Sequence, residues 1–138
     1  MRVRLTLFGM AVFLCLVPML VAQDAAKADP KHYSVVSEND QVRILRVHYG
    51  AHEKSVMHSH PNLVAIFLTD GKMRFTFPGG KTEDSTVKAG QAVFVPAVTH
   101  LPEGTGDKDF EIILVELKGK AGAAKTAAAK PAAKTENK

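Results

Sequence analysis

Cysteine is scarce in this chain, which has 138 residues and one cysteine, Cys15. A fold held together by disulfide bonds is therefore excluded. The length allows one domain of ordinary size, so an enzyme with separate cofactor and substrate domains is excluded as well. The sequence also has no glycine-rich phosphate loop, no G-x-S-x-G nucleophile turn and no internal repeat. What remains is one domain whose core must come from the packing of apolar side chains.

Acidic residues are fewer than basic ones over the whole chain, with 14 Asp and Glu against 18 Lys and Arg. The excess of bases lies at the two ends. Arg2 and Arg4 belong to the N-terminal segment, and residues 118–138 contain six lysines and one acid. Residues 23–117 have 10 bases and 13 acids, a net charge of −3. The central part is therefore not expected to bind nucleic acid.

The N-terminal segment, residues 1–22, has the layout of a signal peptide. A short basic start is followed by an almost entirely apolar stretch over 5–21 and by the small residue Ala22. This pattern predicts cleavage after Ala22 and export, to the periplasm or out of the cell. The alternative is an uncleaved membrane anchor. Its 17 residues reach only the lower limit for a spanning helix, and Pro18 interrupts them.

The C-terminal segment, residues 119–138, consists mainly of lysine and alanine and has no large apolar side chain. It cannot contribute to a core, and we expect a disordered tail. Its positive charge would allow weak contact with anionic polymers or lipids of the cell envelope.

The central part has the periodicity of β-strands. Apolar and polar side chains alternate strictly over 72–77, and 110–117 is rich in β-branched and other apolar residues. The apolar stretch 92–95 is expected to be a buried strand. Asp70 and Gly71 are typical of a hairpin turn. The predicted strands are 33–36, 42–49, 63–69, 72–77, 82–87, 92–95 and 110–117.

Seven or eight short strands at regular spacing favour an all-β sandwich or barrel. A Rossmann fold is not expected, because it needs helices between the strands. Residues 103–109 are rich in glycine and aspartate and are expected to be a loop.

Six histidines carry most of the candidate chemistry. His58 and His60 are two positions apart, so on an extended chain both side chains point to the same face and can approach one metal ion. His100 follows 40 residues later, at the end of the strand 92–95. His48 is expected to be half-buried in its strand, and His32 to be exposed.

The glycines around the histidine pair strengthen the assignment of a metal site. Gly50 precedes His58 by eight positions, and Gly71 follows His60 by eleven. Gly90, Pro96 and His100 form a second group. These two groups resemble the two motifs of the cupin family, and residues 39–43 resemble the opening strand of small single-domain cupins. The resemblance implies a cupin-type double-stranded β-helix, a jelly-roll barrel, over residues 31–118. It also implies that His58, His60 and His100 are ligands of a divalent metal ion.

The sequence departs from the family pattern at the position of the metal-binding glutamate. That glutamate would fall at Val64 or Ala65, both apolar, and Gly104 stands where the second motif has asparagine. A site with three neutral histidines leaves the ion with its full charge, which makes it a stronger Lewis acid. Three nitrogens and an open position suit Fe, Zn, Mn, Ni or Cu, and can activate water. Glu103, and more remotely Glu53 with His52, are candidates to replace the missing carboxylate.

Three functions remain open. An enzyme, such as a dioxygenase or an isomerase, would use the metal on a small molecule held between pocket walls at Phe67, Phe75 and Phe94. A non-catalytic barrel would hold a metal or small ligand, and a metal-free barrel would act through its tail. The resemblance also implies a homodimer, for which the edge strand 33–36 offers a surface. Arg43 and Arg46 would either point into the barrel and bind an acidic ligand, or point outward.

Overall fold

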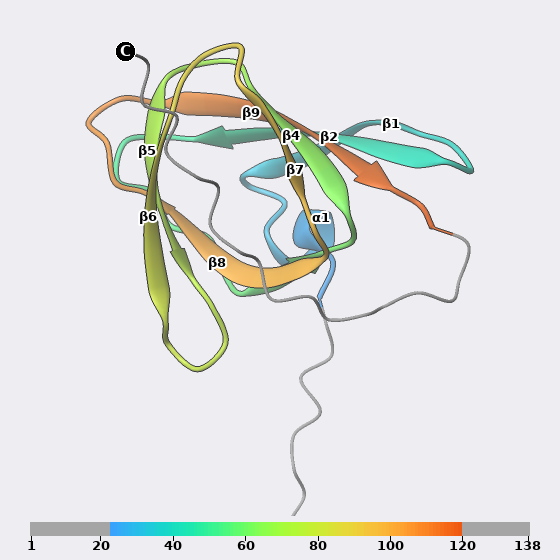
Figure 1. Cartoon of the computed structure of the whole chain (residues 1–138), viewed down its shortest axis with the longest axis horizontal. Coiled ribbons are helices and arrows are strands. Elements are labelled where there is room, and N and C mark those ends of the chain that lie inside the picture. The colour runs from blue at the N-terminus through green and yellow to red at the C-terminus, as the bar shows by residue number, and fades with distance from the viewer. Residues whose placement is uncertain (1–22, 120–138) are drawn as a thin grey trace, which may run out of the picture.

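The computed structural model describes residues 23–119 (Figure 1). The predicted signal peptide, and the predicted tail except for Gly119, lie outside this range. Within it, no helix is long and apolar enough to cross a membrane. The same range contains one short helix, α1 (Ala25–Ala28), and nine strands. The strands are β1 (Tyr33–Glu38), β2 (Val42–Tyr49), β3 (His58–His60), β4 (Leu63–Phe67), β5 (Gly71–Thr76), β6 (Thr82–Val87), β7 (Ala92–Val95), β8 (Val98–Gly104) and β9 (Phe110–Leu117).

The strands form two antiparallel sheets. One sheet has the order β1-β2-β9-β4-β7, and the other has the order β3-β8-β5-β6. Figure 1 shows them wrapped around a common interior, with β9 and β8 on opposite sides of it. The predicted all-β, jelly-roll barrel is confirmed.

The core follows from side chains that alternate along the strands. In β9 each second residue is buried, from Phe110 through Ile112 and Leu114 to Glu116, while the residues between them are partly exposed. Its neighbour β2 buries Leu45, and both sheets direct their apolar face inward. Burial of each large apolar side chain contributes about 1.5–3 kcal/mol, which makes this interior the main source of stability.

The predicted hairpin at Asp70 and Gly71 is wrong. Strand β4 pairs with β7 and β9, whereas β5 pairs with β6 and β8, so the chain crosses here from one sheet to the other. The carboxylate of Asp70 accepts the backbone N–H of Ala89 at 2.9 Å instead of closing a turn. A Cβ at Gly71 would lie 3.1 Å from the ring of Phe110, so any larger residue would require that ring to move slightly.

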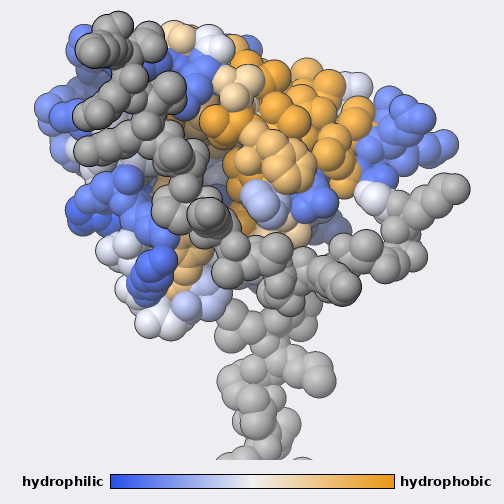
Figure 2. Space-filling view, in the orientation of Figure 1, coloured by the Kyte–Doolittle hydropathy of each residue, from blue (hydrophilic) through white to orange (hydrophobic). Residues whose placement is uncertain are grey.

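The predicted burial of 92–95 is also wrong. Strand β7 lies at the edge of its sheet, and its side chains alternate between exposed and partly exposed positions. Phe94 points outward and is 60% exposed. Figure 2 shows an apolar area of the surface over β4 and β7.

Strand β8 was not predicted, because Pro102 and Gly104 interrupt the sequence pattern. It runs over Val98–Gly104 and pairs with both β3 and β5, so it takes in the first residues of the predicted 103–109 loop. Strand β1 also continues to Glu38, two residues beyond its predicted end.

The segment before residue 31 is part of the packed unit. Asp24 caps α1 by accepting the backbone N–H of Lys27, and Ala25 is completely buried. The backbone oxygen of Gln23 accepts the N–H of Ser59 at 2.8 Å, which joins this segment to β3. Figure 1 shows α1 between the two sheets. The N-terminal segment therefore covers the part of the barrel that carries His58 and His60.

Candidate metal centre

The structure brings His58, His60 and His100 together. The pairing of β3 with β8 places His100 directly opposite His58, and the alternation of side chains in β3 points His58 and His60 inward. His58 is 1% and His60 is 4% exposed. The ring centroids are 4.8–5.4 Å apart, and one nitrogen from each ring lies within 4.8 Å of the others. This cluster could hold a metal ion.

Hydrogen bonds turn one nitrogen of two rings toward the centre of the cluster. His58 Nδ1 lies 2.8 Å from the carbonyl oxygen of Val56, which can only accept, so Nδ1 carries the hydrogen and Nε2 presents its lone pair. His60 Nδ1 is bonded in the same way to Glu116 Oε1 at 2.6 Å. The Nε2 atoms of His58 and His60 lie 3.0 Å apart.

His100 supplies the observation that most directly indicates a ligand. Its Nε2 is buried and has no hydrogen-bond partner in the described part of the chain. Such a buried polar atom is rare in folded proteins, because losing its water costs about 1–3 kcal/mol. A cation that accepted this lone pair, together with those of His58 and His60, would remove the cost. The residues present therefore fit a metal ion.

The electrostatics keep the rings of His58 and His100 neutral. Burial, with a smaller contribution from the neighbouring His60, lowers the pKa of His58 to about 4. Burial likewise lowers the pKa of His100 to about 3. Both rings are therefore unprotonated near neutral pH, which is the form that binds metals.

A second layer behind the histidines contains Glu116, which the sequence reasoning missed. Glu116 is 1% exposed and comes from β9, in the sheet opposite β3. One oxygen bonds to His60, and the other accepts from Arg43 at 2.6 and 2.7 Å. Arg43 also pairs with Asp24. The signal was present in the sequence, because strand alternation places Glu116 on the same face as Phe110, a buried residue.

A second polar group lies behind His58. The Oγ of Ser55 is 3.4 Å from His58 Nδ1 and donates to the buried carboxylate of Asp29. Asp29 is also 2.6 Å from His32 Nδ1. Burial raises the pKa of Asp29, but the hydrogen bonds from Ser55 and His32 outweigh it and lower the value.

The predicted exposure of His32 is wrong. His32 is buried because its ring stacks on Tyr49, with centroids 4.4 Å apart. His48 points outward from β2, and its side chain is 51% exposed. Arg46 also points outward and pairs with Glu111, whereas Arg43 reaches the interior to pair with Glu116.

The carboxylates proposed as replacements for the family glutamate do not join the cluster of His58, His60 and His100. The side chain of Glu53 bonds to Lys31, to the backbone N–H of Gly50 and to His32, and the first two contacts contribute most to lowering its pKa to about 2. Glu103 pairs with Lys54 at 3.7 Å.

His52 does not reach the cluster either. It adopts a positive φ of 58° in the loop before β3, and its exposed ring bonds to Asp107 at 2.9 Å.

Of the predicted pocket walls, Phe75 contacts the site. Its ring stacks on His100, with centroids 5.3 Å apart and an angle of 12° between the planes. Tyr33, which was not predicted, meets His58 edge-on at 4.8 Å. Phe67 lies in the core, and Phe94 points away from the interior and cannot line the site.

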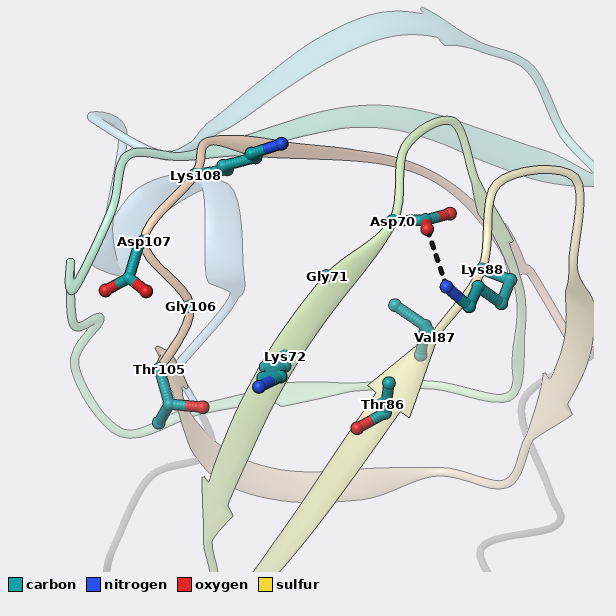
Figure 3. A pocket seen from close by; sticks show the side chains of 10 residues that line it. All are labelled: Asp70, Gly71, Lys72, Thr86, Val87, Lys88, Thr105, Gly106, Asp107 and Lys108. Atoms are coloured by element: carbon teal, nitrogen blue, oxygen red, sulfur yellow. Dashed lines mark hydrogen bonds and ion pairs between the residues drawn. The ribbon is translucent and has the colours of Figure 1, made fainter.

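Figure 3 shows a surface pocket elsewhere, between β5, β6 and the loop that follows β8. Lysines 72, 88 and 108 line it, and Lys88 pairs with Asp70 at 2.7 Å. None of the three clustered histidines belongs to it. The candidate metal centre is therefore separate from this pocket.

Comparison with known proteins agrees with this architecture. The family model for the cupin domain matches residues 45–116. A cupin domain from Bordetella pertussis Tohama I superimposes with a TM-score of 0.59 at 21% identity, over 63% of this chain and 92% of that one. An RmlC-like cupin from Methanocaldococcus jannaschii gives 0.52 at 19% identity, over 73% and 92% of the two chains. Identities this low show the fold alone. No curated protein matches the chain.

The family match covers more than half of the chain and includes both strands that carry the clustered histidines. Together with the two antiparallel sheets wrapped around one interior, it shows that this chain belongs to the cupin domain family.

Proposed function

We propose that this protein binds one divalent metal ion through His58, His60 and His100. The observation that carries the proposal is the buried Nε2 of His100, which has no partner among residues 23–119 and lies beside two imidazoles whose Nδ1 atoms are already bonded elsewhere. Zinc takes imidazole nitrogen at about 2.0–2.1 Å, and Fe, Mn, Ni and Cu also accept such ligands. No carboxylate belongs to this ligand set, so no atom bound directly to the ion would neutralise its charge.

Three protein ligands leave at least one position open for water or a small molecule. When bound there, such an ion would supply Lewis-acid chemistry, which polarises carbonyl groups and lowers the pKa of coordinated water. We therefore propose that a small molecule with an oxygen donor binds there. A redox-active metal would suit oxygenation, and zinc would suit isomerisation or hydrolysis. Phe75 and Tyr33 would contact such a ligand from the apolar side, because they already pack on His100 and His58.

The burial of the site favours a second candidate, a non-catalytic barrel that holds its metal. His58 and His60 are almost completely buried, and α1 contacts the strand that carries them. Turnover that requires the metal would support an enzyme. Release of the metal over hours, with no turnover, would support the holding role.

We further propose that residues 1–22 direct export and that the metal is held outside the cytoplasm. The basic start, apolar stretch and Ala22 support this proposal. N-terminal sequencing of the protein from its native cell envelope should give Gln23 as the first residue. Recovery of a chain that still begins at Met1 in the membrane fraction would support the anchor instead.

Metal content measured by plasma mass spectrometry tests the main proposal. The protein is purified without a metal-binding tag, beside a His58→Ala/His60→Ala double variant. Two exposed histidines provide the matched control, His48→Ala/His52→Ala. We expect close to one equivalent of metal in the wild type and the control, and none in the first double variant. Absence of metal from the wild type after reconstitution would refute the proposal.

A further inference from the structure

The cupin motif places a glutamate among the metal ligands, but here the corresponding positions are Val64 and Ala65. A buried carboxylate is nevertheless present, one hydrogen bond behind a ligand. We propose that Glu116 is the positioning residue of the metal centre: it fixes the hydrogen of His60 on Nδ1, so that Nε2 faces the ion. This inference rests on the proposed metal binding at His58, His60 and His100.

The geometry is that of a carboxylate that orients a metal-binding histidine. Glu116 Oε1 lies 2.6 Å from His60 Nδ1, and the two side chains are 2% and 1% exposed. Glu116 belongs to β9 and His60 to β3, so this bond connects the two sheets across the interior. A carboxylate can only accept here, so the hydrogen must reside on Nδ1. The Nε2 of the same ring is then the one that lies 3.0 Å from His58 Nε2, inside the cluster.

The environment allows a carboxylate to stay in this position. A buried carboxylate is costly unless it is paired, and Arg43 contacts the second oxygen of Glu116 at 2.6 and 2.7 Å. Arg43 is held in turn by Asp24 at the start of α1. Burial opposes the charge of Arg43, but the bonds to Asp24 and Glu116 raise its pKa. Each oxygen of Glu116 therefore has a partner, and only one of the two is an arginine.

The bond to His60 distinguishes this arrangement from a simple buried ion pair. Arg43 alone would satisfy a structural carboxylate, whereas Glu116 directs a separate oxygen to the imidazole. His58 donates instead to a neutral carbonyl, that of Val56. A carboxylate behind a metal-binding histidine strengthens it as a ligand, and such partners change metal affinity by about 10–100-fold. Glu116 would thus offset part of the charge of the ion without occupying a coordination position.

Zinc affinity of two matched variants tests the inference. Glu116→Gln keeps the size of the side chain but removes its charge. Glu111→Gln removes a carboxylate from the same strand, where Glu111 pairs with Arg46 at 2.7 Å on the outer face. We expect Glu116→Gln to bind zinc about 10–100 times more weakly than the wild type, and Glu111→Gln to bind within about twofold of it. Competition with a chromophoric chelator gives the affinities.

A spectroscopic measurement on the wild type removes the dependence on a variant that folds poorly. Long-range ¹H–¹⁵N spectra of the zinc-loaded protein identify which nitrogen of each histidine carries hydrogen. We expect His60 to carry it on Nδ1 and to bind zinc through Nε2. Hydrogen on Nε2 of His60 would overturn the inference.

The outcomes separate this inference from the proposal on which it rests. Equal zinc affinity of folded Glu116→Gln and the wild type would overturn the role of Glu116 and leave the metal site intact. Failure of the wild type to bind zinc or any of the other four metals would overturn both.

Discussion

Replacement of His100, a partly buried residue, by leucine should stabilise the metal-free protein. The Nε2 of His100 is buried and has no partner within the part of the chain that the structure describes, a condition that costs about 1–3 kcal/mol. Leucine has a similar volume and removes this polar atom. It also removes the stacking of His100 on Phe75, worth about 0.5–1.5 kcal/mol. The balance predicts that His100→Leu unfolds with a free energy about 1 kcal/mol higher than the wild type at pH 7.5.

The difference should grow as the pH falls. The pKa of His100 is about 3 in the folded protein and 6.5 in an ordinary environment. Between these values the unfolded chain binds a proton that the folded chain does not, so the wild type loses about 1.4 kcal/mol per pH unit. At pH 5 the wild type has lost about 2 kcal/mol of unfolding free energy in this way, whereas His100→Leu has no titrating group at this position and does not lose it. The predicted advantage of His100→Leu at pH 5 is therefore about 3 kcal/mol.

Urea unfolding of chelator-treated protein at pH 7.5 and pH 5 measures both values. His48→Leu is the matched control, because His48 is exposed and lies outside the cluster. Added zinc should raise the unfolding midpoint of the wild type and of His48→Leu, but not that of His100→Leu. The reasoning would be refuted if His100→Leu were less stable than the wild type at both pH values, or if the difference between them did not change with pH.

Three further predictions concern the surroundings of the site and the barrel. Gly104→Ala should lower the free energy of unfolding, measured in urea, by about 1–3 kcal/mol, because its Cβ would lie 2.9 Å from the ring of Phe110. The control Gly106→Ala should change that free energy by less than about 0.5 kcal/mol, because the nearest atom to its Cβ would be 3.7 Å away. Asp29→Ala should lower the unfolding free energy by about 1–3 kcal/mol in the same assay, since it leaves Ser55 and His32 without their buried partner. It should weaken zinc binding less than Glu116→Gln does, because Asp29 acts through Ser55, which is 3.4 Å from His58. A larger loss of zinc affinity than that of Glu116→Gln would contradict this order. Phe94→Ser should leave the unfolding free energy within about 0.5 kcal/mol of the wild type, because the side chain is 60% exposed at a sheet edge, and a loss above 2 kcal/mol would show that something covers it.

The bounds of β2, β6, β7 and β9 agree with the sequence pattern. Apolar and β-branched residues mark β2, β7 and β9, whereas β6 is a polar strand set off by the turn residues on either side of it. Which strands pair with each other was harder to predict from the sequence. Asp70 and Gly71 have the composition of a hairpin, but whether consecutive strands pair or separate into two sheets depends on contacts far along the chain. The apolar residues of β7 likewise do not reveal that the strand lies at an edge.

The candidate site could be predicted in part for a similar reason. Strand alternation placed His58 and His60 on one face, and the family resemblance added His100. The structure brings all three together through the pairing of β3 with β8. Glu116 could not be assigned to the site from the sequence, because its contact with His60 spans 56 residues and joins two sheets, and the sequence does not show which strands face each other. His32 was misplaced because its burial depends on stacking against Tyr49.

Anomalous diffraction from crystals of the metal-loaded protein tests the central claim most directly. Data collected on both sides of the absorption edge of the retained metal locate the ion and its ligands. The account predicts one ion bonded to His58, His60 and His100, at about 2.0–2.1 Å if the metal is zinc, with Glu116 bonded to His60 and not to the ion. An ion bound elsewhere, or one that leaves any of these three histidines unbound, would contradict it.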